Sequence, residues 1–240
     1  DFCLSRGLGD VYKRQVVIKS TVIPGTTNRF NRECKNIQIV FNPEFLTEAN
    51  YIEDFKNQNR IIIGGPRPAS TIVKNMFTKV FQEVPIIKTG SSTAESVKYF
   101  INTFLATKVS FANEFKQICD QTDVDYDKVV EYALYDERIG NSHLSVPGPD
   151  GSLGFGGHCF PKDLNAMIKK AEALGIKPDV MKGAWEKNKE VRKIFNSVGL
   201  EISRLKRTRF GPIFLPSKLA KGKYMELSNK DIDSIKNYGV

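Results

Sequence analysis

The first ninety residues alternate short apolar runs with longer amphipathic stretches. The runs are rich in β-branched residues and are followed by polar residues, glycine or proline, which is typical of buried strands. They lie at Val16–Ile18, Ile37–Phe41, Arg60–Gly65 and Pro85–Ile87. Apolar residues recur at helical spacing over 70–82, and a short helix is expected to end near Arg32. Strands that alternate with helices predict a parallel α/β sheet.

After residue 91 the pattern becomes helical. Apolar residues spaced by three, four and seven predict one helix over 91–120, which is long enough to extend beyond a compact domain and meet a partner. A glycine-rich loop follows over 148–157. Further helices are expected at 127–134, from Pro161 to Gly175, and at 180–195. The chain is therefore predicted to join a partial sheet to a mostly helical second part.

Composition narrows the class of protein. With 40% hydrophobic and 26% charged residues, the chain is neither disordered nor collagen-like. No apolar run is long enough for a transmembrane helix, so no membrane contact is expected. The four cysteines are scattered, which suits a reducing compartment, and the expected location is the cytoplasm. Neither His143 nor His158 has partners at metal-binding spacing, so no metal is expected.

The net charge of +9 is concentrated late in the chain, where residues 201–240 hold nine Lys or Arg against four Asp or Glu. A solvated basic tail over 196–240 explains this run. Nucleic-acid binding would call for regularly spaced aromatic residues among the basic ones, and it is not expected because those present lack this spacing. Residues 1–15 follow neither a strand nor a helix period and are interpreted as a leader outside the folded domain.

One stretch combines a cysteine with features that activate a thiol. Cys159 follows the glycines of residues 154–157 and precedes a helix expected to start at Pro161. A helix N-terminus favours thiolate over thiol, and glycines let a ligand approach the backbone. Asp163 falls in the predicted first turn, within reach of such a ligand. The alternative is that Cys159 is a small buried apolar residue and Asp163 a helix-start acid.

Two further pairs of polar residues are spaced by four. Lys98 and Asn102 share one face of the long helix, either as site residues or as an exposed pair beside the apolar stripe. Glu44 and Glu48 follow a strand directly, where α/β sheets place ligand sites, and are expected on a short helical turn. Acids at such a position are also common as helix caps, so the pattern alone leaves both interpretations open.

Six motifs occur together and in order. They are Lys19–Val22 (KSTV), Phe41–Glu48 (FNPEFLTE), Asn59–Gly65 (NRIIIGG), Lys98 with Asn102, Asp136–Gly140 (DERIG) and Gly154–Asp163 (GFGGHCFPKD). In this combination, over about residues 16–192, the chain resembles the nucleotide-sugar dehydrogenase family, most closely its members that act on UDP-glucose. The resemblance implies a partial Rossmann-like NAD-binding domain over 16–90 and a helical central domain for catalysis and dimerisation over 91–195.

The resemblance also implies a reaction, the NAD-dependent oxidation of the C6 alcohol of UDP-glucose to the carboxylate of UDP-glucuronate. Cys159 would add to the intermediate aldehyde to form a thiohemiacetal, and loss of hydride would give a thioester that water hydrolyses. Lys98 would stabilise the oxyanion, with Asn102 as a neutral donor. Asp163 and Thr21 would orient or activate the water.

Binding residues follow from the same resemblance. Glu44 would be the general acid/base of the thioester step and would also contact the substrate. The implied substrate-binding set is Glu44, Phe45, Leu46, Lys98, Asn102, Arg138, Ser152, Leu153, Gly154, Phe155, Gly156 and Gly157. The implied cofactor-binding set is Ser20, Thr21, Glu48 and Cys159. The loop 152–157 would close over the substrate, and Arg138 would reach it across a homodimer formed by the helix over 91–120.

Two features of the family are not found in the sequence. The Gly-x-Gly-x-x-Gly turn that opens its cofactor domain is missing, and residues 197–240 do not resemble its third domain. A sequence shortened at both ends is therefore expected. Two alternatives stay open: a related substrate, GDP-mannose or a UDP-N-acetylhexosamine, or an inactive chain that serves only as a helical dimer core.

Overall fold

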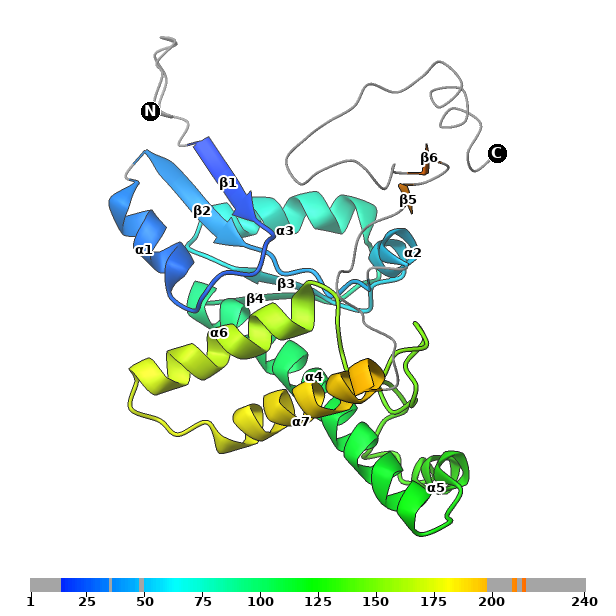
Figure 1. Cartoon of the computed structure of the whole chain (residues 1–240). Coiled ribbons are helices and arrows are strands. Elements are labelled where there is room, and N and C mark those ends of the chain that lie inside the picture. Colours follow the sequence, from blue (N-terminus) through cyan, green and yellow to red (C-terminus); the bar gives the residue numbers. More distant parts are fainter. Residues whose placement is uncertain (1–13, 35, 48–49, 198–208, 211–212, 215–240) are drawn as a thin grey trace. The chain divides into compact units, whose positions relative to one another are not determined.

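The computed structural model describes residues 14–34, 36–47, 50–197, 209–210 and 213–214 (Figure 1). Contacts divide the chain into two compact units, residues 1–192 and 193–240. In the second unit, β5 (Arg209–Phe210) and β6 (Ile213–Phe214) pair antiparallel. Residues 1–13 of the leader interpreted at 1–15 lie outside the described residues. Nearly all of the basic tail interpreted at 196–240 also lies outside them.

Four strands form one sheet in the order β1-β2-β3-β4. Their bounds are Arg14–Ile18, Ile37–Phe41, Ile61–Gly64 and Ile86–Thr89. The outer pairs, β1 with β2 and β3 with β4, are parallel. The central pair is antiparallel, with Phe41 opposite Gly64. The prediction of a parallel sheet is therefore confirmed for two strand pairs and wrong for the third.

The connection between β2 and β3 explains the reversed strand. It holds a short helix that the pattern did not indicate, α2 (Tyr51–Lys56), and no helix that crosses the sheet. Parallel neighbours need such a crossover, whereas a chain that turns back at the same edge enters the next strand in the opposite direction. Apolar runs mark where strands lie but carry no information about their direction.

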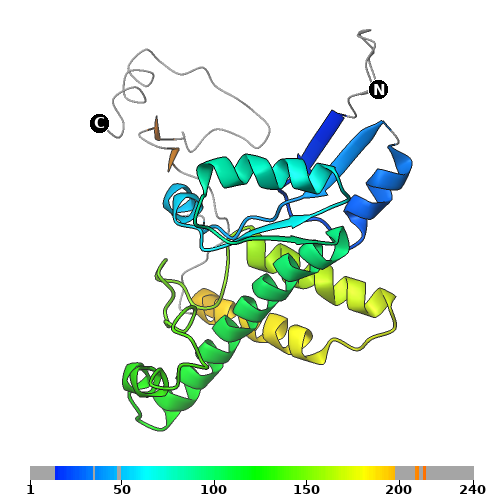
Figure 2. The ribbon, with the colours of Figure 1, turned by 180° about the vertical axis from the view of Figure 1, so that it is seen from behind.

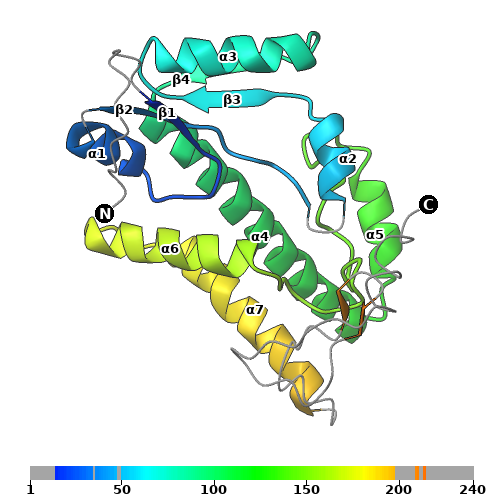
Figure 3. The same ribbon diagram turned by 90° about the horizontal axis from the view of Figure 1, so that it is seen from above.

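Two helices cover opposite faces of the sheet, α3 (Ala69–Val80) on one side and the start of α4 (Ser91–Gln121) on the other (Figures 2 and 3). Side chains alternate along a strand, so Ile61 and Ile63 pack towards α3 while Ile62 packs towards α4. Gly64 allows this close approach, because a Cβ there would lie 2.5 Å from the Cβ of Ala94.

A buried carboxylate joins α1 (Thr26–Glu33) to α4. Glu95 is fully buried and accepts hydrogen bonds from the backbone N–H of Gly25 (2.6 Å) and from the N–H and hydroxyl of Thr27 (2.8 and 2.6 Å). These N–H groups belong to the start of α1, where a negative charge is favoured. Glu95 thereby fixes the segment that leads from β1 into α1.

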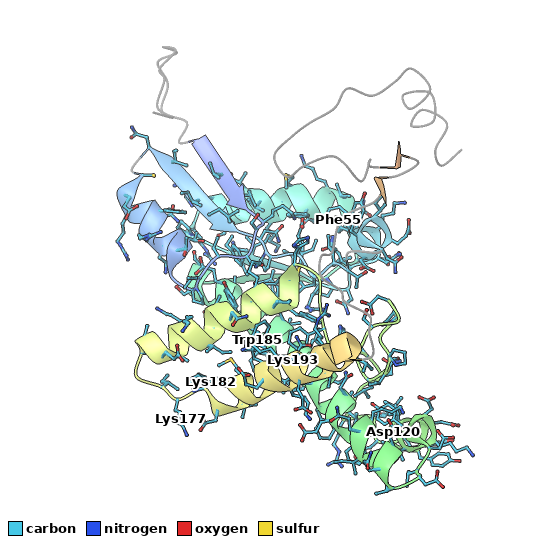
Figure 4. All side chains as sticks on the ribbon, viewed as in Figure 1. Phe55, Asp120, Lys177, Lys182, Trp185 and Lys193 are labelled. Atoms are coloured by element: carbon cyan, nitrogen blue, oxygen red, sulfur yellow. The ribbon has the colours of Figure 1, made fainter. Side chains whose placement is uncertain are left out.

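The helical part is organised around α4, which confirms the single long helix predicted over 91–120. The other helices are α5 (Tyr126–Ala133), α6 (Cys159–Ala173) and α7 (Asp179–Ser197). A core of Ala106, Phe155, Leu164, Ile168 and Ala184 joins α4, α6 and α7. Trp185 packs against this core, while α5 lies at the far end of α4 near Asp120 (Figure 4). Within the described residues, no helix is long and apolar enough to cross a membrane.

Candidate active site

The helix that carries the cysteine begins earlier than expected. α6 starts at Cys159, and Pro161 is its third residue rather than its first. The first N–H groups of a helix have no intrahelical acceptor, so proline is tolerated throughout the first turn. Cys159 is therefore the first helical residue, and its side chain is exposed. Asp163 lies one turn further along, in the second turn, which corrects its predicted position.

Asp163 and Asn102 meet in the interior between α6 and α4. Asp163 is fully buried, and Asn102 donates from Nδ2 to its Oδ2 at 2.6 Å. The ammonium of Lys162 contacts the second carboxylate oxygen. A buried carboxylate needs such partners to offset its desolvation. The alternatives of an exposed Asn102 and a helix-start Asp163 are therefore wrong.

Lys98 extends from α4 towards the segment after β2. Its Nζ donates to the main-chain carbonyl of Glu44 at 2.5 Å and lies 5.3 Å from the ring centroid of Phe45. Burial lowers the pKa of Lys98, and the negative charges of Asp163 and of a Cys159 thiolate act in the opposite direction. The charges of the predicted nucleophile and of both predicted catalytic acids thus act on Lys98.

The segment that carries Glu44 is neither helix nor strand. Residues 42–47 are not helical, so the predicted helical turn is wrong, and Glu48 lies outside the described residues. Asn42 holds the segment in place: it is buried, its N–H donates to Ile18 O, and its Nδ2 donates to Ile62 O, both at 2.8 Å. The start of the segment is therefore bonded to two strands at once. Phe45 and Leu46 beyond it are half-buried.

Ser20 and Thr21 come just after β1 and Lys19, at the same edge of the sheet, with Ser20 exposed and Thr21 half-buried. Open α/β sheets place ligands at the carboxyl ends of their strands, so these hydroxyls stay predicted ligands of NAD. The N-terminus of α1 does not fit its pyrophosphate, because the carboxylate of Glu95 already takes the N–H groups there. No group of three His, Cys, Asp or Glu that could hold a metal occurs in the part of the chain that the structure describes.

The loop before Cys159 is held by two buried asparagines that the sequence analysis missed. Asn113 of α4 accepts the N–H of Gly154 at 3.1 Å, and Asn188 of α7 accepts that of Phe155 at 2.7 Å. Gly154 has φ +71°, and a Cβ there would lie 2.3 Å from Asn188 Oδ1. No local pattern marks these asparagines, because each acts on a loop far away in the sequence.

Replacing Asn188 with leucine is expected to lower the free energy of unfolding by about 1–3 kcal/mol, because the buried N–H of Phe155 would lose its acceptor. Urea denaturation measures this difference. The control is Asn75→Leu on an exposed face of α3, with an expected change below about 0.5 kcal/mol. Equal effects of both substitutions would contradict the role assigned to Asn188.

The remaining predicted binding residues differ in burial and do not share one environment. The side chain of Phe155 is buried in the helical core, and Leu153 packs against a second cluster that contains Ala112. Ser152 and Gly156 are half-buried and Gly157 is exposed. Arg138 is almost fully exposed and pairs with Asp136 of its own loop. The structure therefore brings Cys159, Lys98, Asn102, Asp163 and Glu44 together and leaves Arg138 outside that group.

Comparisons with known proteins match both parts of the chain to one family. The sequence profile of the NAD-binding domain of the UDP-glucose/GDP-mannose dehydrogenase family matches residues 7–84, and that of the central domain of the family matches 92–190. A UDP-glucose 6-dehydrogenase of Haloferax volcanii is 36% identical over 187 residues, which are 72% of this chain and 42% of that protein. The match to the NAD-binding domain begins at residue 7, within the range 1–15 interpreted as a leader.

Solved structures of nucleotide-sugar dehydrogenases are also similar to this chain. A UDP-glucose dehydrogenase from Pyrobaculum islandicum is similar with a TM-score of 0.66 and 35% identity, over 77% of this chain and 44% of that one. A UDP-D-ManNAc dehydrogenase from Pyrococcus horikoshii has a TM-score of 0.64 and 25% identity, over 78% and 44% of the two chains. The chain thus spans less than half the length of these relatives. It belongs to the UDP-glucose/GDP-mannose dehydrogenase family, whose NAD-binding and central domains its residues match.

Proposed function

We propose that the protein to which this chain belongs oxidises the C6 alcohol of UDP-glucose to the carboxylate in two NAD-dependent steps, with Cys159 as the nucleophile. One observation carries the proposal: an exposed cysteine at a helix N-terminus lies one turn before a buried Asp163, and Lys98 interacts electrostatically with both. The similarity to UDP-glucose dehydrogenases favours this substrate. We also place the end of the cofactor-binding part near residue 90.

Cys159 would supply the covalent chemistry. Its sulfur adds to the C6 aldehyde to give a thiohemiacetal, and removal of hydride leaves a thioester. NAD, when bound, accepts the hydride of each oxidation. Lys98 stabilises the negative oxygen that forms on C6, and its half-buried position strengthens this effect because less water screens the charge.

Hydrolysis of the thioester would depend on the residues around Cys159. Asp163 orients the attacking water together with Thr21, and Asn102 fixes the orientation of the Asp163 carboxylate through their 2.6 Å hydrogen bond. Glu44 transfers the proton of the thioester step. Burial, together with the charges of Asp163 and Glu95, raises the pKa of Tyr99 to about 12, so this phenol stays neutral beside them.

The experiment is to incubate the chain with NAD and one nucleotide sugar at a time and to follow formation of NADH. The sugars are UDP-glucose, GDP-mannose and UDP-N-acetylglucosamine. Two NADH per UDP-glucose consumed would support the proposal. Turnover with only one of the other two sugars would replace UDP-glucose with that substrate. Absence of turnover with all three, in a chain that is a dimer by light scattering, would favour the helical dimer core instead.

We further propose a homodimer formed through α4. In such a dimer, Arg138 would serve the site of the partner subunit. An apolar stripe runs along one face of this helix and is exposed to between 36% and 72%. Its residues are Phe100, Phe104, Phe111, Phe115 and Ile118. They recur at spacings of four, seven, four and three, as on a helix that packs lengthwise against another helix. Exposed apolar stripes of this length mark interaction surfaces.

Replacing Phe111 with glutamate is expected to weaken the dimer at least about 100-fold, because a carboxylate would be buried among the aromatic rings of the stripe. Sedimentation velocity across a concentration series measures the change. Tyr135→Glu is the control, since this residue is 84% exposed and lies outside α4. A Phe111→Glu protein that dimerises as tightly as the Tyr135→Glu protein would exclude the α4 interface.

A further inference from the structure

We propose that Lys19 is a positioning residue that holds the carboxylate of Glu44 in the active site. The inference rests on the proposed function, in which Glu44 transfers the proton of the thioester step. Lys19 follows β1 directly and Glu44 follows β2, and these strands are parallel neighbours. Their side chains meet at the carboxyl edge of the sheet, where Lys19 Nζ lies 2.8 Å from Glu44 Oε1.

The ammonium of Lys19 is itself fixed from several sides. It donates to Asn42 Oδ1 at 3.1 Å, and Asn42 is buried and bonded to β1 and β3. The rings of Phe55 and Phe77 lie 5.7 and 5.8 Å away, and Figure 4 shows Phe55 beside this edge of the sheet. A cation that contacts two ring faces and a buried amide has little freedom to move. Lys19 can therefore serve as a fixed point for Glu44.

Glu44 is consequently held at two places by two lysines. Lys98 binds its main-chain carbonyl, and Lys19 binds its side chain. Both side chains of the Lys19–Glu44 pair are 38% exposed, and pairs with that much solvent contribute little to stability. Without Lys19, however, the Glu44 side chain would regain its rotamers, and a proton-transfer group displaced by an ångström loses most of its effect. Lys19 should matter for the rate of one step and little for folding.

The test compares Lys19→Met and Lys19→Arg with the control Lys56→Met, which removes an equal charge from an exposed pair with Glu53. We expect Lys19→Met to lower kcat about tenfold and Lys19→Arg to restore it to within about threefold. The ratio kcat/KM, which reports the steps up to the first release of NADH, should change less than about threefold. Intact-mass analysis should show the thioester accumulating on the Lys19→Met protein.

A double-mutant cycle decides whether Lys19 acts through Glu44. In a Glu44→Gln background, Lys19→Met should have no further effect on kcat, because the group that it positions is gone. Equal effects in both backgrounds, or an unchanged kcat in Lys19→Met alone, would overturn the inference. Should Lys19→Met not fold, Lys19→Gln replaces it in the cycle. Absence of turnover by the unsubstituted protein with all three sugars would instead contradict the proposed function. That result is obtained before any variant is made.

Discussion

Cys159→Ser is expected to lower NADH formation from UDP-glucose by at least about a thousandfold. A serine hydroxyl is a much weaker nucleophile than the sulfur of a cysteine, because it has almost no anionic form near neutral pH. The variant also cannot form the thioester, so the second oxidation would proceed through a much less reactive ester. Initial rates of NADH formation at saturating UDP-glucose measure the loss.

The loss should not come from misfolding. Cys159 is exposed, and serine has nearly the same size, so the thermal unfolding temperature of Cys159→Ser should match that of the unsubstituted protein. Cys34→Ser is the matched control, since Cys34 is also a free, exposed cysteine but follows α1. The nucleophile assignment fails if Cys159→Ser keeps more than a tenth of the activity, or if both variants lose it equally.

Glu95→Leu is expected to lower the free energy of unfolding by about 3–5 kcal/mol. The carboxylate is fully buried and accepts three hydrogen bonds from the start of α1, and all three donors would lose their partner in the interior. Chemical denaturation followed by circular dichroism measures the change. Leucine fills a similar volume, so the effect reports the lost acceptor rather than a cavity.

Glu33→Leu is the control for Glu95→Leu. Glu33 is exposed, and its carboxylate lies 4.0 Å from Arg29 in a solvent-accessible pair, so its loss should cost less than about 0.5 kcal/mol. A difference of less than about 1 kcal/mol between the two variants would show that α1 is held by something other than Glu95. Because Ser20 and Thr21 precede α1, a large difference would also identify Glu95 as the support of the predicted cofactor edge.

Elements with a strong local period were correctly predicted from the sequence. The helix over Ser91–Gln121 follows from its apolar spacing, and the four strands follow from their β-branched runs. The segment around Cys159 was also identified, because its glycines, cysteine and proline stand next to one another in the chain. Periodicity and adjacency are local properties, and a single sequence reports them directly.

Other features arise only from contacts between distant residues. The start of α6 was misplaced because proline is allowed at any position of the first turn. Lys19 belongs to the motif Lys19–Val22, but its contact with Glu44 depends on β1 and β2 being neighbours. Asn113 and Asn188 act on a loop 41 and 33 residues away, so nothing near them in the chain marks their role.

By itself, the sequence determined the four strands of the main sheet, the long helix α4 and the family that the chain resembles, and it indicated which side chains are chemically suited to the proposed reaction. Only the tertiary structure decided the reversed direction of β3, the burial of Asp163 against Asn102, and the two lysines that hold Glu44. The physical reason is that a local pattern fixes backbone conformation and the buried face of each element. Which faces meet depends on the packing of all of them together.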